Sequence, residues 1–280
     1  MTTIKIVTDS TAELTQDVIE QLGITVVPLT IHVDGQDYLD GVTLSAEEFI
    51  GKMKQSKELP KSSQPSAGTF TEIYDELGKD GSEILSIHMT GGMSGTVKSA
   101  ESAASITSSN VTVVDSRFIS HALAFQVTEA ARLAQQGKSM GEILLHLDRV
   151  RENTRLFVVV DTLDNLVKGG RIGKGRAMLG SLLSIKPIAS LAGGEYTPVA
   201  KARSYKQVIT YLMNEFTKDS AAKRVKAVGI AQADGYQMAT PLKEAIEATG
   251  FKDVKLSFTT PVISTHTGPG AIGFMYLLEG

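Results

Sequence analysis

The chain contains 280 residues, with 28 lysines and arginines against 31 aspartates and glutamates, and therefore carries a formal net charge of −3. This length suggests two domains or one large domain. Because the charge is nearly balanced and no block of five like charges occurs, the sequence is unlike that of a nucleic-acid-binding protein. Cysteine is absent, which excludes disulfides, thiolate metal sites and cysteine nucleophiles.

The sequence also indicates the cellular compartment of the protein. The lack of cysteine agrees with a reducing compartment, and the N-terminus has neither a charged-then-apolar leader nor a small-residue cleavage site. The longest apolar runs, such as 156–160, are far shorter than the roughly 20 residues that a membrane helix needs. We therefore expect a cytoplasmic protein without a membrane-spanning segment.

The first half of the chain repeats one local pattern. Short apolar runs at 4–7, 84–87 and 111–114 each lead into a polar cluster and then into a stretch with helical periodicity. This alternation predicts βαβ units that share a parallel sheet, whose ligands usually bind beyond the carboxyl ends of the strands, where the polar clusters lie. A further helix is predicted over 140–153, whereas the polar region 34–66 is predicted to be an excursion of loops.

The second half of the chain predicts a further set of strands and helices. Gly169 and Gly170 end the first of its helices, and a last helix is expected from Gly270. We place a domain boundary near residue 155, with an N-terminal α/β domain over 1–155 and a C-terminal α/β domain over 156–280. The predicted strands are 156–160, 225–231 and 254–258, a further apolar segment covers 181–188, and the predicted helices are 163–167, 205–216 and 239–248.

The segment Thr90-Gly91-Gly92-Met93-Ser94-Gly95-Thr96 carries the strongest chemical signal. It lies where a predicted strand gives way to a helix, and its glycines allow backbone amides to converge on an anion at the helix N-terminus. Its hydroxyl groups add further donors, so that a carboxylate or a phosphate is the natural ligand. The alternative is a tight turn in which Ser94 or Thr96 only caps the helix. The segment also falls short of the G-x-S-x-G nucleophile elbow, because its final glycine is one position early.

Two other segments have a structural interpretation beside the functional one. Asp9 is placed to accept a phosphate or to move a proton, but Ser10 and Glu13 have the spacing of a helix capping box. The loop Ser62-Ser63-Gln64-Pro65-Ser66 offers hydroxyl groups beside a fixed turn, and the same capping-box spacing recurs over 69–72. By themselves both segments are adequately explained as loops that enter helices.

The glycine-rich stretch 169–176 resembles a phosphate-binding loop only superficially. It lacks the first glycine of the Walker pattern and the hydroxyl residue after Lys174, so what remains is a helix end followed by a basic loop. That loop is either a solvated face or a docking site for an acidic partner. His266 lies among hydroxyls and glycines, and the histidines of the chain show no metal-ligand spacing, so no metal site is expected.

Taken in order, these segments resemble the DegV family, which includes the fatty-acid-binding subunits of bacterial fatty acid kinase. The resemblance runs from residue 4 to about residue 274, and one departure from it is the stretch 119–123, where the family often carries glycine. The motifs that carry it are Val7-Thr8-Asp9-Ser10-Thr11, Ser62-Ser63-Gln64-Pro65-Ser66, Met93-Ser94-Gly95-Thr96, Leu163-Asp164-Asn165-Leu166, Gly169-Gly170-Arg171-Ile172, Lys186-Pro187-Ile188, Lys201-Ala202-Arg203 and His266 with its glycine-rich tail.

The resemblance implies an α/β fold with a parallel-sheet N-terminal domain, an α/β C-terminal domain and a lipid tunnel between them. It implies a carrier of a long-chain fatty acid that is not itself an enzyme, needs no cofactor, and presents its ligand to a partner ATP-dependent kinase for conversion to an acyl-phosphate. Arg171 and Arg203 match arginines that the family uses for docking to that kinase. The residues matched to carboxylate binding are Ser62, Ser63, Ser94, Gly95, Thr96 and His266.

Two other functions remain open from the residues alone. A serine hydrolase would use Ser94 as nucleophile with His266 and an acid such as Asp9. A phosphotransferase that binds a small anion or a nucleotide would use the glycine turn together with Arg171.

Overall fold

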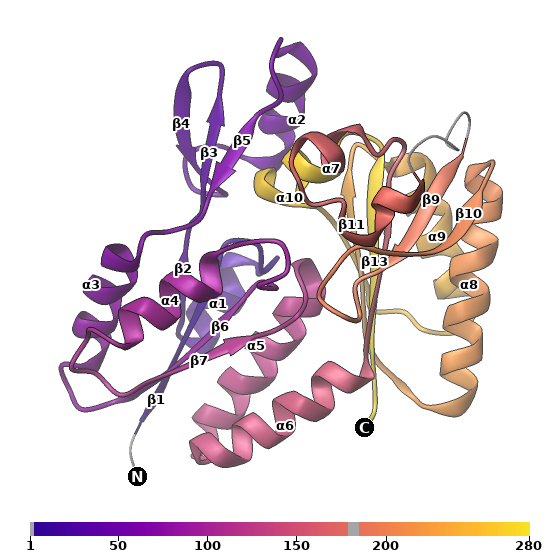
Figure 1. Ribbon diagram of the computed structural model, residues 1–280. Coiled ribbons are helices and arrows are strands. Elements are labelled where there is room, and N and C mark those ends of the chain that lie inside the picture. Colours follow the sequence, from indigo (N-terminus) through magenta and orange to yellow (C-terminus); the bar gives the residue numbers. More distant parts are fainter. Residues whose placement is uncertain (1–2, 179–184) are drawn as a thin grey trace.

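A computed structural model describes residues 3–178 and 185–280 of the chain. The first sheet contains β1 (Ile4–Asp9), β2 (Ile24–Val27), β6 (Glu83–His88) and β7 (Val111–Asp115). It is parallel, in the order β2-β1-β6-β7, as the alternation of apolar runs and helical stretches predicted (Figure 1). Its strands are short and rich in valine, isoleucine and leucine, which suits a sheet covered by helices on both faces.

The second sheet contains β8 (Thr154–Val159), β9 (Lys186–Ser190), β10 (Thr197–Ala202), β11 (Val225–Ala233), β12 (Val254–Phe258) and β13 (Ala271–Leu278). It is mixed, in the order β10-β9-β8-β13-β11-β12. The prediction of a last helix from Gly270 is wrong, because β13 lies within this sheet with neighbours on both sides. Its run of branched and aromatic residues is buried on both faces, which is typical of an internal strand.

The region 34–66, predicted to be loops, contains much of a small third sheet. Its strands are β3 (Thr30–Val33), β4 (Gln36–Leu39) and β5 (Lys61–Ser63), in the order β4-β3-β5, and helix α2 (Ala46–Gln55) lies beside them (Figure 1). The prediction missed a local signal. Asp34 and Gly35 have φ values of 50° and 76°, and an Asp-Gly pair is typical of the two-residue turn that joins such strands.

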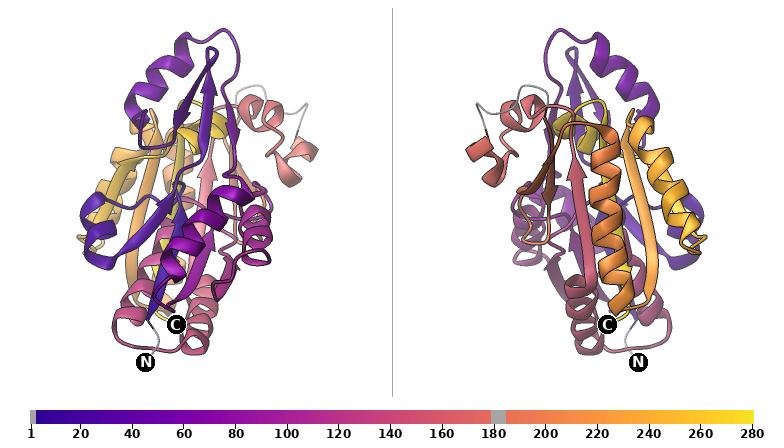
Figure 2. Two further views of the ribbon diagram at one scale, coloured as in Figure 1. Left: turned by 90° about the vertical axis from the view of Figure 1, so that its left-hand side faces the viewer. Right: turned by 90° about the vertical axis from the view of Figure 1, so that its right-hand side faces the viewer.

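One long helix, α5 (Ser120–Gln135), lies between the two large sheets (Figure 1). It packs on β1 and β6 on one side and on β8, β11 and β13 on the other. Helices α3 (Ala67–Gly78) and α4 (Thr96–Ala104) cover the outer face of the first sheet, and α8 (Tyr205–Ala222) and α9 (Tyr236–Ala248) cover that of the second (Figure 2). The chain is therefore layered helix, sheet, helix, sheet, helix.

The remaining helices fill the ends of these layers. Helices α1 (Gln16–Leu22) and α6 (Met140–Asn153) pack against α5. Helix α10 (Pro261–Thr267) packs on β3 and β5 of the third sheet and on α7 (Asp164–Lys168), while the 3-10 turn η1 (Gly173–Met178) packs on β10 (Figure 1). Gly169 and Gly170 end α7 as predicted. The predicted segment 181–188 falls partly outside the described residues. Within the described ranges, none of the helices combines the length and apolar character needed to cross a bilayer.

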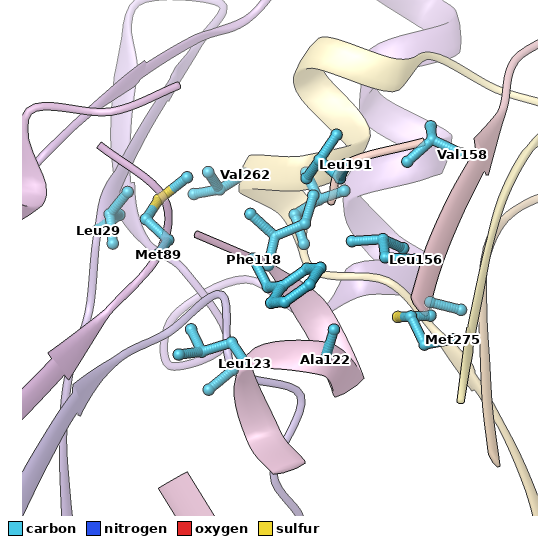
Figure 3. Packing of buried hydrophobic residues seen from close by; sticks show 14 of the residues in the cluster. Leu29, Met89, Phe118, Ala122, Leu123, Leu156, Val158, Leu191, Val262 and Met275 are labelled. Carbon is cyan, nitrogen blue, oxygen red and sulfur yellow. The ribbon is translucent and has the colours of Figure 1, made fainter. Parts of the chain in front are cut away.

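The largest hydrophobic cluster lies between the two large sheets. Side chains from α5 and the loop before it, including Phe118 and Leu123, meet Leu156 of β8 and Met275 of β13 (Figure 3). Burial of apolar surface stabilises by about 25 cal/mol per Å². This shared core therefore holds the two sheets in one arrangement and fixes the walls of the space between them.

Candidate functional site

A cavity of about 310 Å³ lies where β5, α7 and α10 face the end of the first sheet. Most of its wall is apolar and includes Leu29, Met89, Val158, Leu191 and Val262, which come from both halves of the chain (Figure 3). Its polar wall includes Ser62, Ser63, Gln64, Ser94, Arg171 and His266. The cavity therefore joins a cluster of hydrogen-bonding groups to a hydrocarbon-like surface.

Ser62 of β5 and His266 of α10 form the first part of the polar cluster. Oγ of Ser62 lies 2.8 Å from Nε2 of His266, while Nδ1 of this ring is buried and has no hydrogen-bond partner among the described residues. Burial, reinforced by the charge of Arg171, lowers the pKa of His266 to about 4, so the ring is neutral near pH 7. A buried N–H group without an acceptor is rarer in proteins than a buried acceptor without a donor. Because Nδ1 is the nitrogen without a partner, we assign the proton to Nε2.

This assignment sets the direction of the next hydrogen bond. Nε2–H of His266 donates to Oγ of Ser62, so the hydroxyl proton of Ser62 is left to donate to a ligand. The neighbouring Ser63 also lines the cavity, and its Oγ lies 2.8 Å from Nε2 of His32. The pair of serines thus places at least one free hydroxyl donor at the polar end of the cavity.

Ser94 forms the second part of the cluster, in the turn before α4. Its Oγ accepts from the backbone N–H of Thr96 at 3.2 Å and lies 2.8 Å from the hydroxyl of Thr96. Gly95 is the N-cap residue of α4, and a Cβ atom there would overlap the side-chain amide of Gln64. Ser94 lines the cavity, whereas Gly95 and Thr96 lie behind it and hold its position.

Arg171, matched to partner docking, lies in the wall of the cavity. Its Nε donates to the carbonyl of Met93 at 2.9 Å and its Nη1 to the carbonyl of Gly169 at 2.6 Å. The guanidinium therefore joins the loop after α7 to the turn that carries Ser94, and places a positive charge beside the hydroxyl cluster. Arg203, the other matched arginine, lies exposed at the end of β10.

The geometry argues against a hydrolase built on Ser94, His266 and Asp9. His266 pairs with Ser62, and Asp9 is fully buried, where its Oδ2 accepts from the backbone N–H of Met89 and lies 3.1 Å from Nδ1 of His88. Ser94 contacts Thr96, so the three proposed members make three separate sets of hydrogen bonds. The nucleophile–histidine–acid order that such catalysis requires is not formed by these residues.

Behind the cavity lies a buried polar network that the sequence did not indicate. Nε2 of His88 lies 2.7 Å from Oγ of Ser86, which in turn lies 2.7 Å from the hydroxyl of Tyr74. With Asp9, these side chains connect α3, β6 and β1. Because Met89 follows His88 directly and lines the cavity, this network fixes one wall of the site.

The capping box predicted for Ser10 and Glu13 is wrong. Helix α1 begins later, with Thr15 as its N-terminal cap, and Oγ of Ser10 donates to Oδ2 of Asp40 at 2.6 Å. The Glu13 carboxylate is buried against residues of both halves of the chain. The second predicted box, over 69–72, is also displaced, because Ser66 caps α3.

Comparison with known proteins gives the family. The family model described as an uncharacterised protein of the DegV family matches residues 3–279. The chain belongs to the DegV family. A DegV domain-containing protein of Listeria monocytogenes is 45% identical over 281 residues, covering 100% of both chains. A DegV domain-containing protein of Streptococcus pneumoniae is 42% identical over 271 residues, covering 97% of both chains.

Solved DegV structures share the architecture. A DegV family protein from Thermus thermophilus, reported with fatty acid binding, has a TM-score of 0.93 and 32% identity, covering 99% of this chain and all of its own. DegV from Bacillus subtilis, a fatty-acid-binding protein, has a TM-score of 0.92 and 30% identity over 100% of both chains. A stearic-acid-binding protein from Eubacterium ventriosum has a TM-score of 0.86 and 25% identity, covering 98% of both chains. The predicted family and fold class are confirmed.

Asp40 of this DegV protein was also missed from the sequence. It follows β4, is only 1% exposed, and its Oδ1 accepts from the backbone N–H of Val262 at 3.2 Å. Together with Ser10, it ties the third sheet to β1 and to the start of α10, which carries His266. Burial raises the pKa of Asp40 from 3.8 to about 7.

The raised pKa of Asp40 predicts a pH-dependent stability. Because the pKa is higher in the folded chain than in the unfolded chain, the protonated carboxyl contributes stability that is fully present below about pH 4 and is lost as the pH rises to about 7. Relative to Asp40→Asn, the wild type should lose roughly 2–4 kcal/mol across that window. Urea unfolding of both proteins at pH 4, 5.5, 7 and 8 measures the difference. A difference that does not change with pH would refute the assigned ionisation.

Proposed function

We propose that this DegV protein binds a long-chain fatty acid, with the carboxylate at Ser62, Ser94 and His266 and the acyl chain along the apolar wall, and presents it to an ATP-dependent fatty acid kinase. One observation carries the proposal: a single cavity joins a cluster of hydroxyl, imidazole and guanidinium groups to an apolar wall. Fatty-acid binding by the Thermus thermophilus and Bacillus subtilis proteins, and stearic acid binding by the Eubacterium ventriosum protein, support it.

The energetics divide the roles of the two ends of the ligand. Burying about 15 CH₂ groups gains on the order of 12 kcal/mol, whereas one head-group hydrogen bond contributes only about 1 kcal/mol. The chain therefore supplies affinity, and the polar cluster sets the orientation of the carboxylate. A buried carboxylate needs hydrogen bonds, and the hydroxyls of Ser62 and Ser94 beside Arg171 supply donors and a positive charge.

In this proposal the chain needs no cofactor of its own, because the partner kinase supplies the ATP site and makes the acyl-phosphate. Since ATP is the phosphoryl donor, the proposal places the step in the cytoplasm. Arg203 is exposed and can contact the kinase, whereas Arg171 lies in the cavity wall and contacts the turn that carries Ser94. Loss of kinase binding on Arg203→Ala, with fatty acid retained, would support this division.

The ligand itself is identified by extraction. The purified protein is denatured in organic solvent and the extract is analysed by mass spectrometry, with the molar ratio of lipid to protein measured. The proposal expects a long-chain fatty acid at close to one equivalent. An empty extract, together with no uptake of added palmitic acid, would contradict it.

A pair of substitutions tests the division between affinity and orientation. Ser94→Ala and His266→Ala should lower acyl-phosphate formation by the partner kinase at least about tenfold but lower lipid occupancy by less than about threefold, because the acyl chain still supplies most of the binding energy. Ser102→Ala, an exposed serine on α4, is the matched control and should change neither. Equal losses of turnover and occupancy would contradict the assignment.

A further inference from the structure

One further polar group borders the cavity and has no partner. Tyr196 lies in the segment between β9 and β10, lines the cavity and is only 1% exposed. Its hydroxyl is buried and makes no hydrogen bond with any described residue. A buried hydroxyl without a partner destabilises a protein measurably. If the cavity wall contacted only hydrocarbon, phenylalanine would suit this position better than tyrosine, because it has no hydroxyl to bury.

The Tyr196 ring is held in place by part of the glycine-rich stretch 169–176. A Cβ atom on Gly175 would lie 3.1 Å from Cδ1 and Cε1 of the ring, and one on Gly173 would lie 2.9 Å from the carbonyl oxygen of Tyr196. The backbone N–H of Lys174 donates to that carbonyl at 3.1 Å. The turn Gly173-Lys174-Gly175 therefore fits against this residue, and the phenol is positioned by its surroundings rather than left free.

The same segment approaches the polar end of the cavity. The carbonyl of Gly194 accepts from the hydroxyl of Thr90 at 2.8 Å, and a Cβ atom on Gly92 would lie 3.3 Å from Cγ of Glu195. Tyr196 thus follows directly on residues that pack against the turn leading to Ser94. Burial also raises the pKa of the Tyr196 hydroxyl, which keeps it protonated and therefore a donor.

We propose that Tyr196 is a ligand-binding residue whose hydroxyl donates a hydrogen bond to an oxygen atom of the bound acyl ligand. This inference rests on the proposed function and adds a donor to Ser62, Ser94 and His266. The ligand oxygen is either one of the carboxylate, which has lone pairs for about four donors, or one carried by the acyl chain. The described residues offer this hydroxyl no acceptor, and the bound ligand would supply one.

Tyr196→Phe tests the inference, because it keeps the ring and removes only the hydroxyl. Delipidated wild type and variant are compared for displacement of a fluorescent fatty acid by palmitic acid and by hydroxypalmitic acids with the hydroxyl at different positions. A loss of affinity of about three- to tenfold for palmitic acid would assign the donor to the carboxylate. An unchanged affinity for palmitic acid with that loss for one hydroxylated acid would assign it to the chain. No loss with any of these acids would overturn the proposal.

A second readout separates a ligand contact from a structural role. The melting temperature of the delipidated variant should equal or exceed that of the wild type, while its increase on adding the preferred acid should be smaller. A lower melting temperature without ligand would indicate a structural role and overturn the proposal. Tyr236→Phe, at a half-exposed tyrosine on α9, is the matched control. Binding of palmitic acid by the wild type in the same assay tests the proposed function independently of Tyr196.

Discussion

Glu13→Ala should lower the free energy of unfolding by about 3–5 kcal/mol, because it leaves several buried donors without an acceptor. The Glu13 side chain is only 5% exposed. Its Oε1 accepts from Ser120 at 2.8 Å and from Thr259 at 2.6 Å. Its Oε2 accepts from Ser257 at 2.8 Å and lies 3.2 Å from Nε2 of His121. One carboxylate thereby joins the loop after β1, the start of α5 and the strand β12 with the residue that follows it.

The loss is measured by urea unfolding at pH 7, with Glu72→Ala, at an exposed glutamate on α3, as the control that should change stability by less than about 0.5 kcal/mol. Glu13→Gln should fall between the two, because an amide keeps one acceptor oxygen but turns an N–H group toward the same donors. If Glu13→Ala unfolds like the wild type, the carboxylate does not hold the two halves of the chain together.

The Glu13 contacts also bear on the backbone conformation of Ser120. Its φ of 59° is a conformation that favours glycine. Here the hydroxyl of Ser120 donates to Glu13, and its backbone N–H donates to the carbonyl of Thr11 at 2.9 Å. These two hydrogen bonds offset the strain that a side chain brings to this position.

Local patterns predicted what depends on local interactions. The alternation of apolar runs and helical stretches gave the parallel sheet, and the hydroxyls at its carboxyl edge placed Ser94 in the cavity wall. The pair Gly169-Gly170 gave the end of α7. Strand β13 was not predicted, because an internal strand lacks the alternation of apolar and polar residues that distinguishes strands from helices.

The rest depends on partners that are distant in the sequence. Ser62 and His266 are separated by 204 residues, and Asp40 and Val262 by 222. Nothing near Asp40 in the sequence distinguishes it from the exposed aspartates of the same region. Its burial results from the packing of the third sheet on α10, which no local pattern encodes. The resemblance to the DegV family supplied the expectation that Ser62 and His266 share a site, and the structure supplies their geometry.

Gly169→Ala should lower acyl-phosphate formation by the partner kinase about tenfold or more by displacing His266, while the affinity for palmitic acid falls by less than about threefold. Gly169 has φ of −76°, a conformation that alanine adopts without strain, so the effect is steric. A Cβ atom there would overlap Nδ1 of the His266 ring and lie 2.9 Å from the carbonyl oxygen of Asn165. The ring must move, which breaks its 2.8 Å contact with Ser62 and leaves the hydroxyl of Ser62 without its orienting donor.

The adjacent glycine provides the matched control for this prediction. Gly170 has φ of 75°, and a Cβ atom there would meet nothing within 4 Å. Gly170→Ala should therefore cost about 1 kcal/mol of stability through backbone strain while leaving acyl-phosphate formation and the affinity for palmitic acid unchanged. Acyl-phosphate formation, displacement of a fluorescent fatty acid and urea unfolding, measured on both variants, separate the two effects. If Gly169→Ala supports acyl-phosphate formation as well as Gly170→Ala does, the position of His266 does not govern the orientation of the carboxylate.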